Sequence, residues 1–317
     1  VILYSTNSSF APGEFYVLQA ATMIPNPPSW ATVVGKGYWL SRSPDAPALV
    51  GPSISMSYAQ NEVPPGEEPF LQVYFWNGTA WTELPTTLAT DVNTAVAPAQ
   101  GQGLYVLMAS IKIPLHGPGW ELFAYPSQVT QPITRALQSI AGSYSTVYGY
   151  DWNDTTDPWK VYDVSVPTWV NDLRALEFGQ VYWISMTQAI TLYLKGDGTP
   201  AMASNNSSQW PPATYYGQVS SNADFTATPG MTVTAWINGH LCGQGQTFEA
   251  NGQVVYTVNV FAEIPGDNSG CGVPGRTVRF KVGSYDMLSA AMWDNNRVWQ
   301  VPLGSHRLYL PLIIRGS

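Results

Sequence analysis

Oxygen-bearing side chains are concentrated in one short stretch of the chain, DWNDTTD, residues 151–157. Asp151, Asn153, Asp154 and Asp157 offer several carboxylate and amide oxygens, which are the ligand atoms that Ca²⁺ takes in proteins. The stretch lacks the glycine and the distal glutamate of an EF-hand loop. A turn in which these side chains accept hydrogen bonds from nearby backbone amides accounts for the same residues. We keep calcium as a hypothesis and expect no other cofactor.

The chain has two cysteines, Cys242 and Cys271, which are 29 positions apart. In a protein of an oxidising compartment, an isolated pair predicts one disulfide. A metal site that used His240 beside Cys242 would need a second Cys-x-x-Cys half and a further histidine nearby, and the sequence has neither. We therefore predict a disulfide.

The residues that commonly perform catalysis are scattered. The three histidines, His116, His240 and His306, lie in different segments, and no nucleophile elbow, zinc-protease motif, phosphate loop or dinucleotide fingerprint occurs. Glu67 and Glu68 could form the acid pair of a glycosidase, but PPGEEPF indicates a solvated turn bounded by prolines. We expect no enzymatic activity, and a hydrolase with an unrecognised site is the least favoured alternative.

Five asparagines stand in the Asn-x-Ser/Thr sequence that N-glycosylation requires, namely Asn7, Asn77, Asn153, Asn205 and Asn206. Charged residues make up only 11% of the chain, against about 25% in ordinary globular domains. Attached glycans would supply the hydration that such a chain lacks. We therefore predict a glycoprotein.

Aromatic residues make up 13% of the chain, and 13 of them are tryptophans. Exposed planar rings can stack on sugars, so glycans of the cell surface or the environment are candidate partners. Tryptophans at matched positions of a repeat more often belong to the core of each copy, and this interpretation is the favoured one.

The charge balance and the hydropathy pattern exclude two classes of partner. The net charge is −8, and the 13 lysines and arginines are scattered, so nucleic acid is not expected. No apolar run approaches the ~20 residues that span a bilayer. Uncharged polar residues replace charged ones, a balance more common in exported β-rich proteins. The composition predicts an extracellular protein, secreted or attached to the cell surface.

The first 200 residues contain a divergent internal repeat. VYFWNGTAWTEL (73–84) resembles VYGYDWNDTTDPWKVYD (147–163), and each is followed by a glycine-led aromatic strand, GQGLYVLMAS (101–110) and FGQVYWISMT (178–187). A third, shorter copy is expected around SWATVVGKGYWLSRS (29–43).

Two matched pairs of aromatic residues support this repeat. Trp76 and Trp152 are 76 positions apart, and Tyr105 and Tyr182 are 77 apart. Nearly equal spacing at two places is improbable by chance. We take the paired residues as equivalent positions of two copies.

Short runs of Val, Tyr, Trp, Phe and Thr alternate with Pro, Gly, Asn and Asp, which is typical of strands and turns. One segment, QPITRALQSIAG (131–142), predicts a short helix with Pro132 in its first turn and Gly142 at its end.

The predicted fold class is therefore mainly β, with tandem β-rich repeat modules and one short helix, followed by an antiparallel β-sandwich with one disulfide. The expected divisions are a first short module (1–56), a second module (57–114), a third with the helix (115–200), a linker (201–212), the sandwich (213–305) and an apolar terminal strand (306–317).

Three parts of the sequence resemble modular secreted surface proteins of filamentous bacteria. GWELFAYPSQVTQPITRALQSIAG and the residues after it, up to VYWI, are similar to a module of such proteins, and HRLYLPLIIR resembles the tail that many of them carry. The block from PPATYYGQV to VRFKVG resembles a transthyretin-like or Ig-like sandwich. The resemblance implies secretion and modular β architecture, but no reaction and no catalytic residue.

The C-terminal segment SHRLYLPLIIRGS (305–317) is unusually apolar for the end of a chain. Its apolar residues, which would form an assembly strand, are Leu308, Tyr309, Leu310, Leu312, Ile313 and Ile314. A strand with two apolar faces needs neighbours on both sides, and the opening VILY has the same character. The terminus of one copy could complete a sheet of the next, giving a homopolymer. Completion of its own last domain and a cell-surface sorting signal are the alternatives.

We therefore expect a non-enzymatic extracellular structural protein, a subunit of a cell-surface fibre, filament or layer assembled through terminal strand exchange. A carbohydrate-binding adhesin, or an accessory module of a secreted polysaccharide-degrading enzyme, is the alternative.

Overall fold

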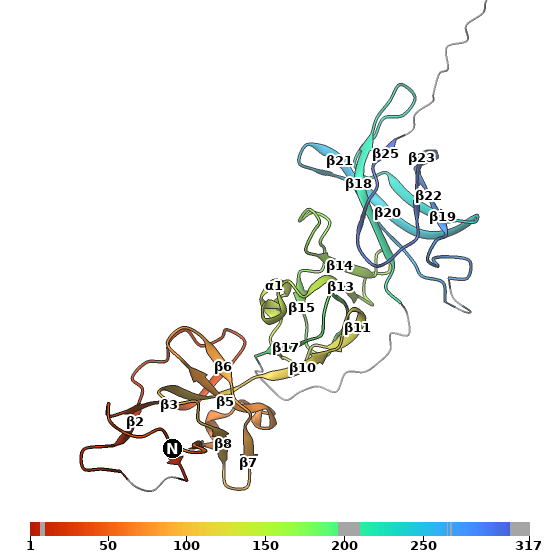
Figure 1. The fold of residues 1–317 in the computed structure, drawn as a ribbon. Helices are drawn as coiled ribbons and strands as arrows, with labels where there is room; N and C mark the ends of the chain where they lie inside the picture. Colours follow the sequence, from red (N-terminus) through yellow and green to blue (C-terminus); the bar gives the residue numbers. More distant parts are fainter. Residues whose placement is uncertain (7–9, 196–209, 265, 267, 305–317) are drawn as a thin grey trace, which may run out of the picture.

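The computed structural model describes residues 1–6, 10–195, 210–264, 266 and 268–304. This part of the chain is mainly β, with 49% strand and 5% helix. Three units follow one another in an extended row, and the N-terminal unit lies at the opposite end from the C-terminal one (Figure 1). We call them the first unit (1–110), the second unit (111–195) and the sandwich domain (210–304).

The first unit consists of two sheets packed over one core. One sheet has the order β1 (Ile2–Tyr4), β4 (Ser53–Ser57), β8 (Thr94–Pro98) and β7 (Thr87–Ala89). The other has the order β2 (Tyr16–Ala20), β3 (Thr32–Arg42), β9 (Gly103–Ala109), β5 (Leu71–Trp76) and β6 (Trp81–Glu83). Two 3₁₀ turns, η1 (Gln60–Glu62) and η2 (Glu68–Phe70), precede β5.

This arrangement corrects the expected division between residues 1–56 and 57–114. In the two sheets β3 pairs with β9, and β4 pairs with β8, so each sheet contains strands from both segments. Val34, Ile54 and Tyr105 are buried in the same core cluster. A short segment with one apolar face cannot bury that face alone, and here the two segments bury theirs against each other.

The second unit contains a four-stranded sheet and two smaller ones. The sheet has the order β11 (Gly119–Ala124), β16 (Val181–Met186), β13 (Tyr144–Tyr150) and β14 (Trp159–Asp163). The pairs are β10 (Ile111–Leu115) with β17 (Ile190–Leu194), and β12 (Gln131–Pro132) with β15 (Ala175–Leu176).

The helix predicted over 131–142 is shorter than expected. It consists of α1 (Ile133–Ala136) and a 3₁₀ turn, η3 (Gln138–Ile140). The hydroxyl of Ser139 donates to the carbonyl of Tyr193 and accepts from the amide of the same residue, which ties the turn to β17. Tertiary contacts therefore decide the conformation of a segment too short to hold a helix alone.

The two units share the arrangement that the repeat predicts. The order β3-β9-β5-β6 matches β11-β16-β13-β14, and the pair β4-β8 matches β12-β15. The matched tyrosines make the same contact: the amide of Gln100 donates to the hydroxyl of Tyr105, and the amide of Glu177 donates to that of Tyr182, each at 2.8 Å. Since β2 and β3 belong to the first unit's own sheet, residues 1–56 do not form a third copy.

The tryptophan match is displaced by two residues. Trp76 pairs with Trp81 across β5 and β6, whereas Tyr150 pairs with Trp159 across β13 and β14. Tyr150 therefore takes the place of Trp76, and Trp152 lies beyond the end of its strand. Sequence similarity aligned the wrong aromatic residue because the second turn, residues 151–158, is four residues longer than the first, residues 77–80.

The sandwich domain is one continuous path of strands that folds over its own core; the strands from β18 to β23 pair antiparallel, and the short β24 and β25 pair with β18 in parallel. The strands are β18 (Ala213–Ser220), β19 (Thr232–Ile237), β20 (His240–Ala250), β21 (Gln253–Val260), β22 (Thr277–Val282), β23 (Tyr285–Met292), β24 (Trp299–Gln300) and β25 (Leu303–Gly304). Residues 240–246 of β20 pair with β19, and residues 247–250 pair with β21, so this long strand joins the two layers. Tyr215, Val233 and Phe280 lie in the core between them.

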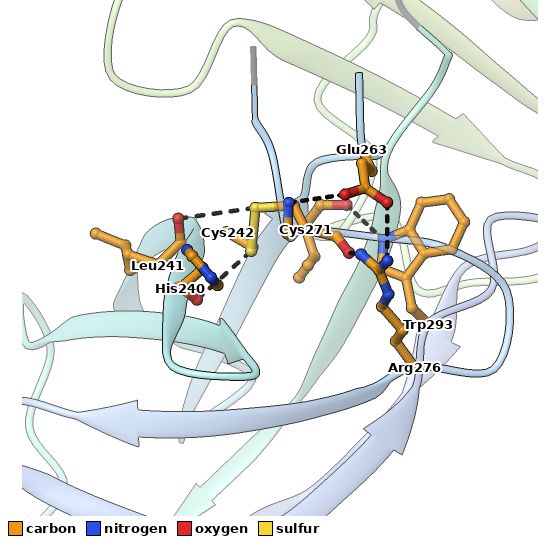
Figure 2. Close-up of a disulfide and its surroundings, with 9 residues drawn as sticks. His240, Leu241, Cys242, Glu263, Cys271, Arg276 and Trp293 are labelled. Atoms are coloured by element: carbon orange, nitrogen blue, oxygen red, sulfur yellow. Dashed lines mark hydrogen bonds and ion pairs between the residues drawn. A yellow bond between two sulfur atoms is a disulfide. The ribbon is translucent and has the colours of Figure 1, made fainter. Parts of the chain in front are cut away.

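The predicted disulfide is confirmed. Cys242 on β20 and Cys271 in the loop before β22 are bonded, with 5.4 Å between their Cα atoms. Figure 2 shows the polar contacts beside it: Arg276 donates to the carbonyl of Cys271 at 2.7 Å and forms an ion pair with Glu263 at 2.9 Å. The disulfide and this ion pair together hold the β21–β22 loop against the end of the sandwich.

Candidate functional site at the domain junction

Both faces of the second unit's four-stranded sheet are apolar. Side chains alternate between the faces of a strand, and Val147 and Ile184 belong to the unit's own core on one face. On the other face Tyr148, Trp159 and Val161 are buried in a separate cluster. A sheet of this kind needs a cover on both sides.

The sandwich domain supplies the second cover. Tyr216 and Val298 are buried in the same cluster as Tyr148 and Trp159. The ring of Trp169 stands edge-on to Tyr216, with 5.6 Å between the ring centroids, and lies 5.7 Å from Phe248. Strands β13 and β14 accordingly lie on the side of the second unit that faces the sandwich (Figure 1). We call this contact the aromatic junction.

A chain of buried hydrogen bonds crosses the aromatic junction. The hydroxyl of Tyr148 lies 2.7 Å from that of Thr214, and Thr214 donates in turn to Oδ1 of Asn259 at 2.5 Å. Nδ2 of Asn259 donates to Oδ1 of Asp157 and to the carbonyl of Trp159, both at 2.9 Å. Since Thr214 donates to Asn259, it accepts from Tyr148. Burial raises the pKa of Tyr148 above its ordinary value, which keeps this hydroxyl a donor.

The equivalent face of the first unit is covered differently. There the preceding chain segment, residues 21–31, packs on Tyr74 and Leu104, and Nε1 of Trp81 donates to the carbonyl of Pro25 at 3.0 Å. The same surface of the repeat is thus closed by its own chain in one copy and by another domain in the other.

The first and second units are also joined by specific contacts. The rings of Trp30 and Tyr193 lie 4.6 Å apart. Glu83 accepts a hydrogen bond from the Tyr193 hydroxyl at 3.1 Å and forms an ion pair with Lys112 at 2.5 Å. Both interfaces therefore combine aromatic packing with polar contacts.

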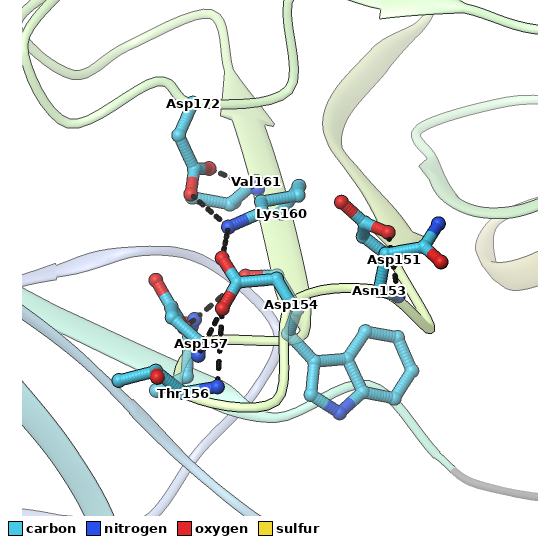
Figure 3. Close-up of polar contacts among 10 residues, drawn as sticks. Asp151, Asn153, Asp154, Thr156, Asp157, Lys160, Val161 and Asp172 are labelled. Carbon is cyan, nitrogen blue, oxygen red and sulfur yellow. Dashed lines mark hydrogen bonds and ion pairs between the residues drawn. The ribbon is translucent and has the colours of Figure 1, made fainter.

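The acidic stretch of residues 151–157 forms hydrogen-bonded turns beside the aromatic junction. Asp154 accepts from the amides of Thr156 and Asp157 and forms an ion pair with Lys160 at 2.7 Å. The hydrogen bond from Lys160 lowers the pKa of Asp154 to about 2. Figure 3 shows Asp154 directed toward Lys160.

Asp151 and Asn153 lie apart from Asp154, and Oδ1 of Asp151 accepts from the amide of Asn153 at 2.9 Å (Figure 3). Among the described residues, no three His, Cys, Asp or Glu side chains are grouped so as to hold a metal ion. The contacts of this stretch fit the turn interpretation, and we do not carry the calcium hypothesis further.

A groove of about 480 Å³ opens next to these turns. Its lining includes Trp152 from the turn after β13, Lys160 from β14, and Asp172, Arg174, Glu177 and Gln180 from the segments around β15. Asp172 accepts from the amide of Val161 at 2.6 Å and lies 3.9 Å from Lys160. Burial raises the pKa of Asp172 to about 6.

The other predicted site residues do not come together. Asn77 and Asn153 are exposed on turns, whereas Asn7, Asn205 and Asn206 lie outside the described residues, as does the whole assembly strand from Leu308 to Ile314. His116 and His240 belong to different units, and His306 is not described.

The turn around Glu67 was expected to be a solvated loop, and the structure corrects this expectation. Glu67 is fully buried, and Glu68 accepts a hydrogen bond from the hydroxyl of Tyr58 at 2.8 Å. Pro64 and Pro65 precede Glu67 and η2 follows it, and together they fold this turn back onto the first unit.

Thr214, Asn259 and Asp172 were missed by sequence reasoning. No motif marks Thr214 and Asn259, whose partners include residues of another domain, and none marks Asp172, whose partners Val161 and Lys160 lie on β14. The apolar character of both faces of YSTVYGY was the available signal that this strand is covered on two sides.

Comparison of the chain with protein-family models, with curated proteins and with solved structures found no match. The resemblance to modular bacterial surface proteins stays a prediction. In the described ranges, no helix has the length and apolar character needed to cross a membrane.

Proposed function

We propose that this chain is a non-enzymatic extracellular structural protein whose three β units are joined into a stiff, extended spacer. The observation that carries the proposal is the aromatic junction, in which a buried polar chain from Tyr148 through Thr214 to Asn259 accompanies the apolar contact. Domains that move freely have small polar interfaces. Here, rotation of the sandwich would leave buried hydroxyl and amide groups without partners, which costs about 1–3 kcal/mol for each group.

Two further features support an extracellular location. The disulfide Cys242–Cys271 is of the kind that persists in oxidising compartments. The low content of charged residues is compatible with an exported chain that carries glycans. Intact mass tests the glycan part of the proposal, because the bare polypeptide weighs 34.6 kDa.

Relaxation of backbone amides in solution NMR tests the stiff-spacer proposal. Amides of all three units should fit one strongly anisotropic rotational diffusion tensor. Substitution of Asn259 by alanine should give the sandwich domain its own, faster tumbling. A need for separate diffusion tensors for the three units of the unaltered protein would refute the proposal.

We also propose that copies join through their termini. Strand β1 is an edge strand, and no other strand of the described chain pairs with its outer edge. Its side chains Ile2 and Tyr4 are 54% and 52% exposed. The occupant we propose for this edge is the segment 306–317 of a second copy, because an unpaired edge with exposed apolar side chains is a template for an added strand.

Charge favours this pairing. Residues 1–110 contain seven acidic and two basic residues, whereas the segment 306–317 contains two arginines and no acid. Deletion of 306–317 should abolish polymers while leaving the monomer soluble, and acidic substitution of Ile2 and Tyr4 should have the same effect. Polymers that persist after the deletion refute strand exchange, and a lower melting temperature of the monomer would assign the segment to its own sandwich domain.

A further inference from the structure

Trp152 is the most exposed large aromatic side chain beside the groove, at 62%. In the first unit the turn after the equivalent strand position, Trp76, is shorter, and its second residue is Gly78. The first unit therefore closes this turn without an aromatic side chain. The exposed face of a tryptophan ring can stack on a ligand.

The ring of Trp152 is held in place although it is exposed. It packs on Tyr150, with 4.5 Å between the ring centroids, and Tyr150 stands edge-on to Trp159 at 5.1 Å. Trp159 itself is buried in the aromatic junction. A supported ring loses little conformational entropy when a ligand stacks on it, and stacking is favoured for that reason.

The rest of the groove offers hydrogen-bonding groups of both kinds. Lys160 and Arg174 are donors, Asp151, Asp172 and Glu177 are acceptors, and Gln180 is both. The lining thus holds two basic and three acidic side chains, so the groove favours neither a polyanion nor a polycation. Hydroxyl groups donate and accept at once, and such a mixed lining suits a ligand rich in them.

The groove volume of about 480 Å³ falls in the range of small-molecule sites, roughly 300–1,000 Å³. From the supported ring, the mixed polar lining and the volume, we infer that the groove beside Trp152 binds a neutral oligosaccharide, with one sugar face stacked on the indole and its hydroxyls bonded to Asp172, Arg174 and Glu177. This inference goes beyond the spacer function and does not depend on it.

Affinity electrophoresis in gels containing a soluble neutral polysaccharide tests the inference. The probes are laminarin, dextran, galactomannan and hydroxyethylcellulose, with alginate as the polyanionic comparison. At least one neutral probe should retard the unaltered protein, and alginate should not. Trp152→Ala should weaken the association constant by about tenfold, as the loss of a stacking contact of about 1.4 kcal/mol implies.

A matched control is available outside the groove. Trp210 is also exposed, at 56%, and stacks on Trp183 with 5.3 Å between the centroids. Trp210→Ala should leave retardation unchanged, and Glu177→Gln should weaken it without altering the melting temperature. The preparation should have the mass of the bare polypeptide, so that a glycan attached to Asn153 does not fill the groove.

Three results would overturn the inference: no retardation by any neutral probe, retardation by alginate alone, or equal binding by the unaltered protein and Trp152→Ala. Because Trp152 is exposed, its substitution should leave the fold intact, which a thermal melt monitored by circular dichroism checks. The tumbling of the three units is a separate measurement, so failure here leaves the spacer proposal untouched.

Discussion

Asn259 provides the sharpest test of the aromatic junction. Its side chain makes three hydrogen bonds: two cross to the second unit, to Asp157 and the carbonyl of Trp159, and the third, with Thr214, holds the residue that Tyr148 of the second unit contacts. Only 7% of the residue is exposed. Asn259→Ala removes all three bonds. Their former partners stay largely buried, where little water can replace the lost contacts.

The expected loss of stability follows from the kinds of hydrogen bond that are removed. The two bonds to neutral partners are worth about 1 kcal/mol each, and the bond to the carboxylate of Asp157 about 1.5–3 kcal/mol. The sum is about 4 kcal/mol, which is large against the 5–15 kcal/mol stability of an ordinary domain. Because two of the three lost bonds, including the strongest, lie between domains, most of the effect should fall on the coupling of the second unit to the sandwich.

Urea denaturation, followed by the amide signals of each unit, measures this coupling. In the unaltered protein the second unit and the sandwich should unfold in one transition, and in Asn259→Ala in two. Gln253→Ala is the control, since Gln253 is an exposed amide side chain on the same strand, β21. It should change the free energy of unfolding by less than about 0.5 kcal/mol.

The pH dependence adds a second check. Burial raises the pKa of Asp157, and the hydrogen bond from Asn259 opposes that rise. Removing the bond should raise this pKa further, so Asn259→Ala should be less destabilising at pH 4 than at pH 7. A loss of under 1 kcal/mol with a single shared transition would refute the account of the junction.

Three further outcomes are expected. Replacing Cys242 and Cys271 by alanine should lower the free energy of unfolding of the sandwich domain by about 3–4 kcal/mol, because the disulfide closes a 29-residue separation, and a urea titration with no such shift would contradict this. Tyr105→Phe and Tyr182→Phe should each cost about 1 kcal/mol in thermal melts, since each removes the hydroxyl that accepts from a turn amide, that of Gln100 or Glu177, and a neutral effect in one unit alone would count against their equivalence. Burial raises the pKa of Asp172 to about 6, so the folded protein holds this proton at pH values where the unfolded chain has lost it. Relative to Asp172→Asn, the free energy of unfolding of the unaltered protein should therefore rise by about 1 kcal/mol as the pH falls from 7 to 4. The value is small because 39% of the side chain is exposed and solvent screens it. A relative rise on raising the pH would contradict this prediction.

Much of the local architecture could be predicted from the chain alone. The alternation of aromatic and β-branched residues with turn residues indicated a mainly β protein, and a single pair of cysteines indicated one disulfide. Both are properties of neighbouring residues or of a count, so they need no knowledge of which strands meet. The match of Tyr105 with Tyr182 likewise identified the two copies of the repeat, because each tyrosine binds an amide only five residues away.

The sequence by itself determined the kind of element along the chain, whereas tertiary structure decided which elements share a core. Residues 1–56 and 57–110 share two sheets and one core because β3 pairs with β9 and β4 pairs with β8, and these partners are far apart in sequence. In the same way, the outer face of β13 is closed by Tyr216 and Asn259 of another domain. Periodicity reports that a face is apolar, but the identity of its cover depends on contacts between distant segments.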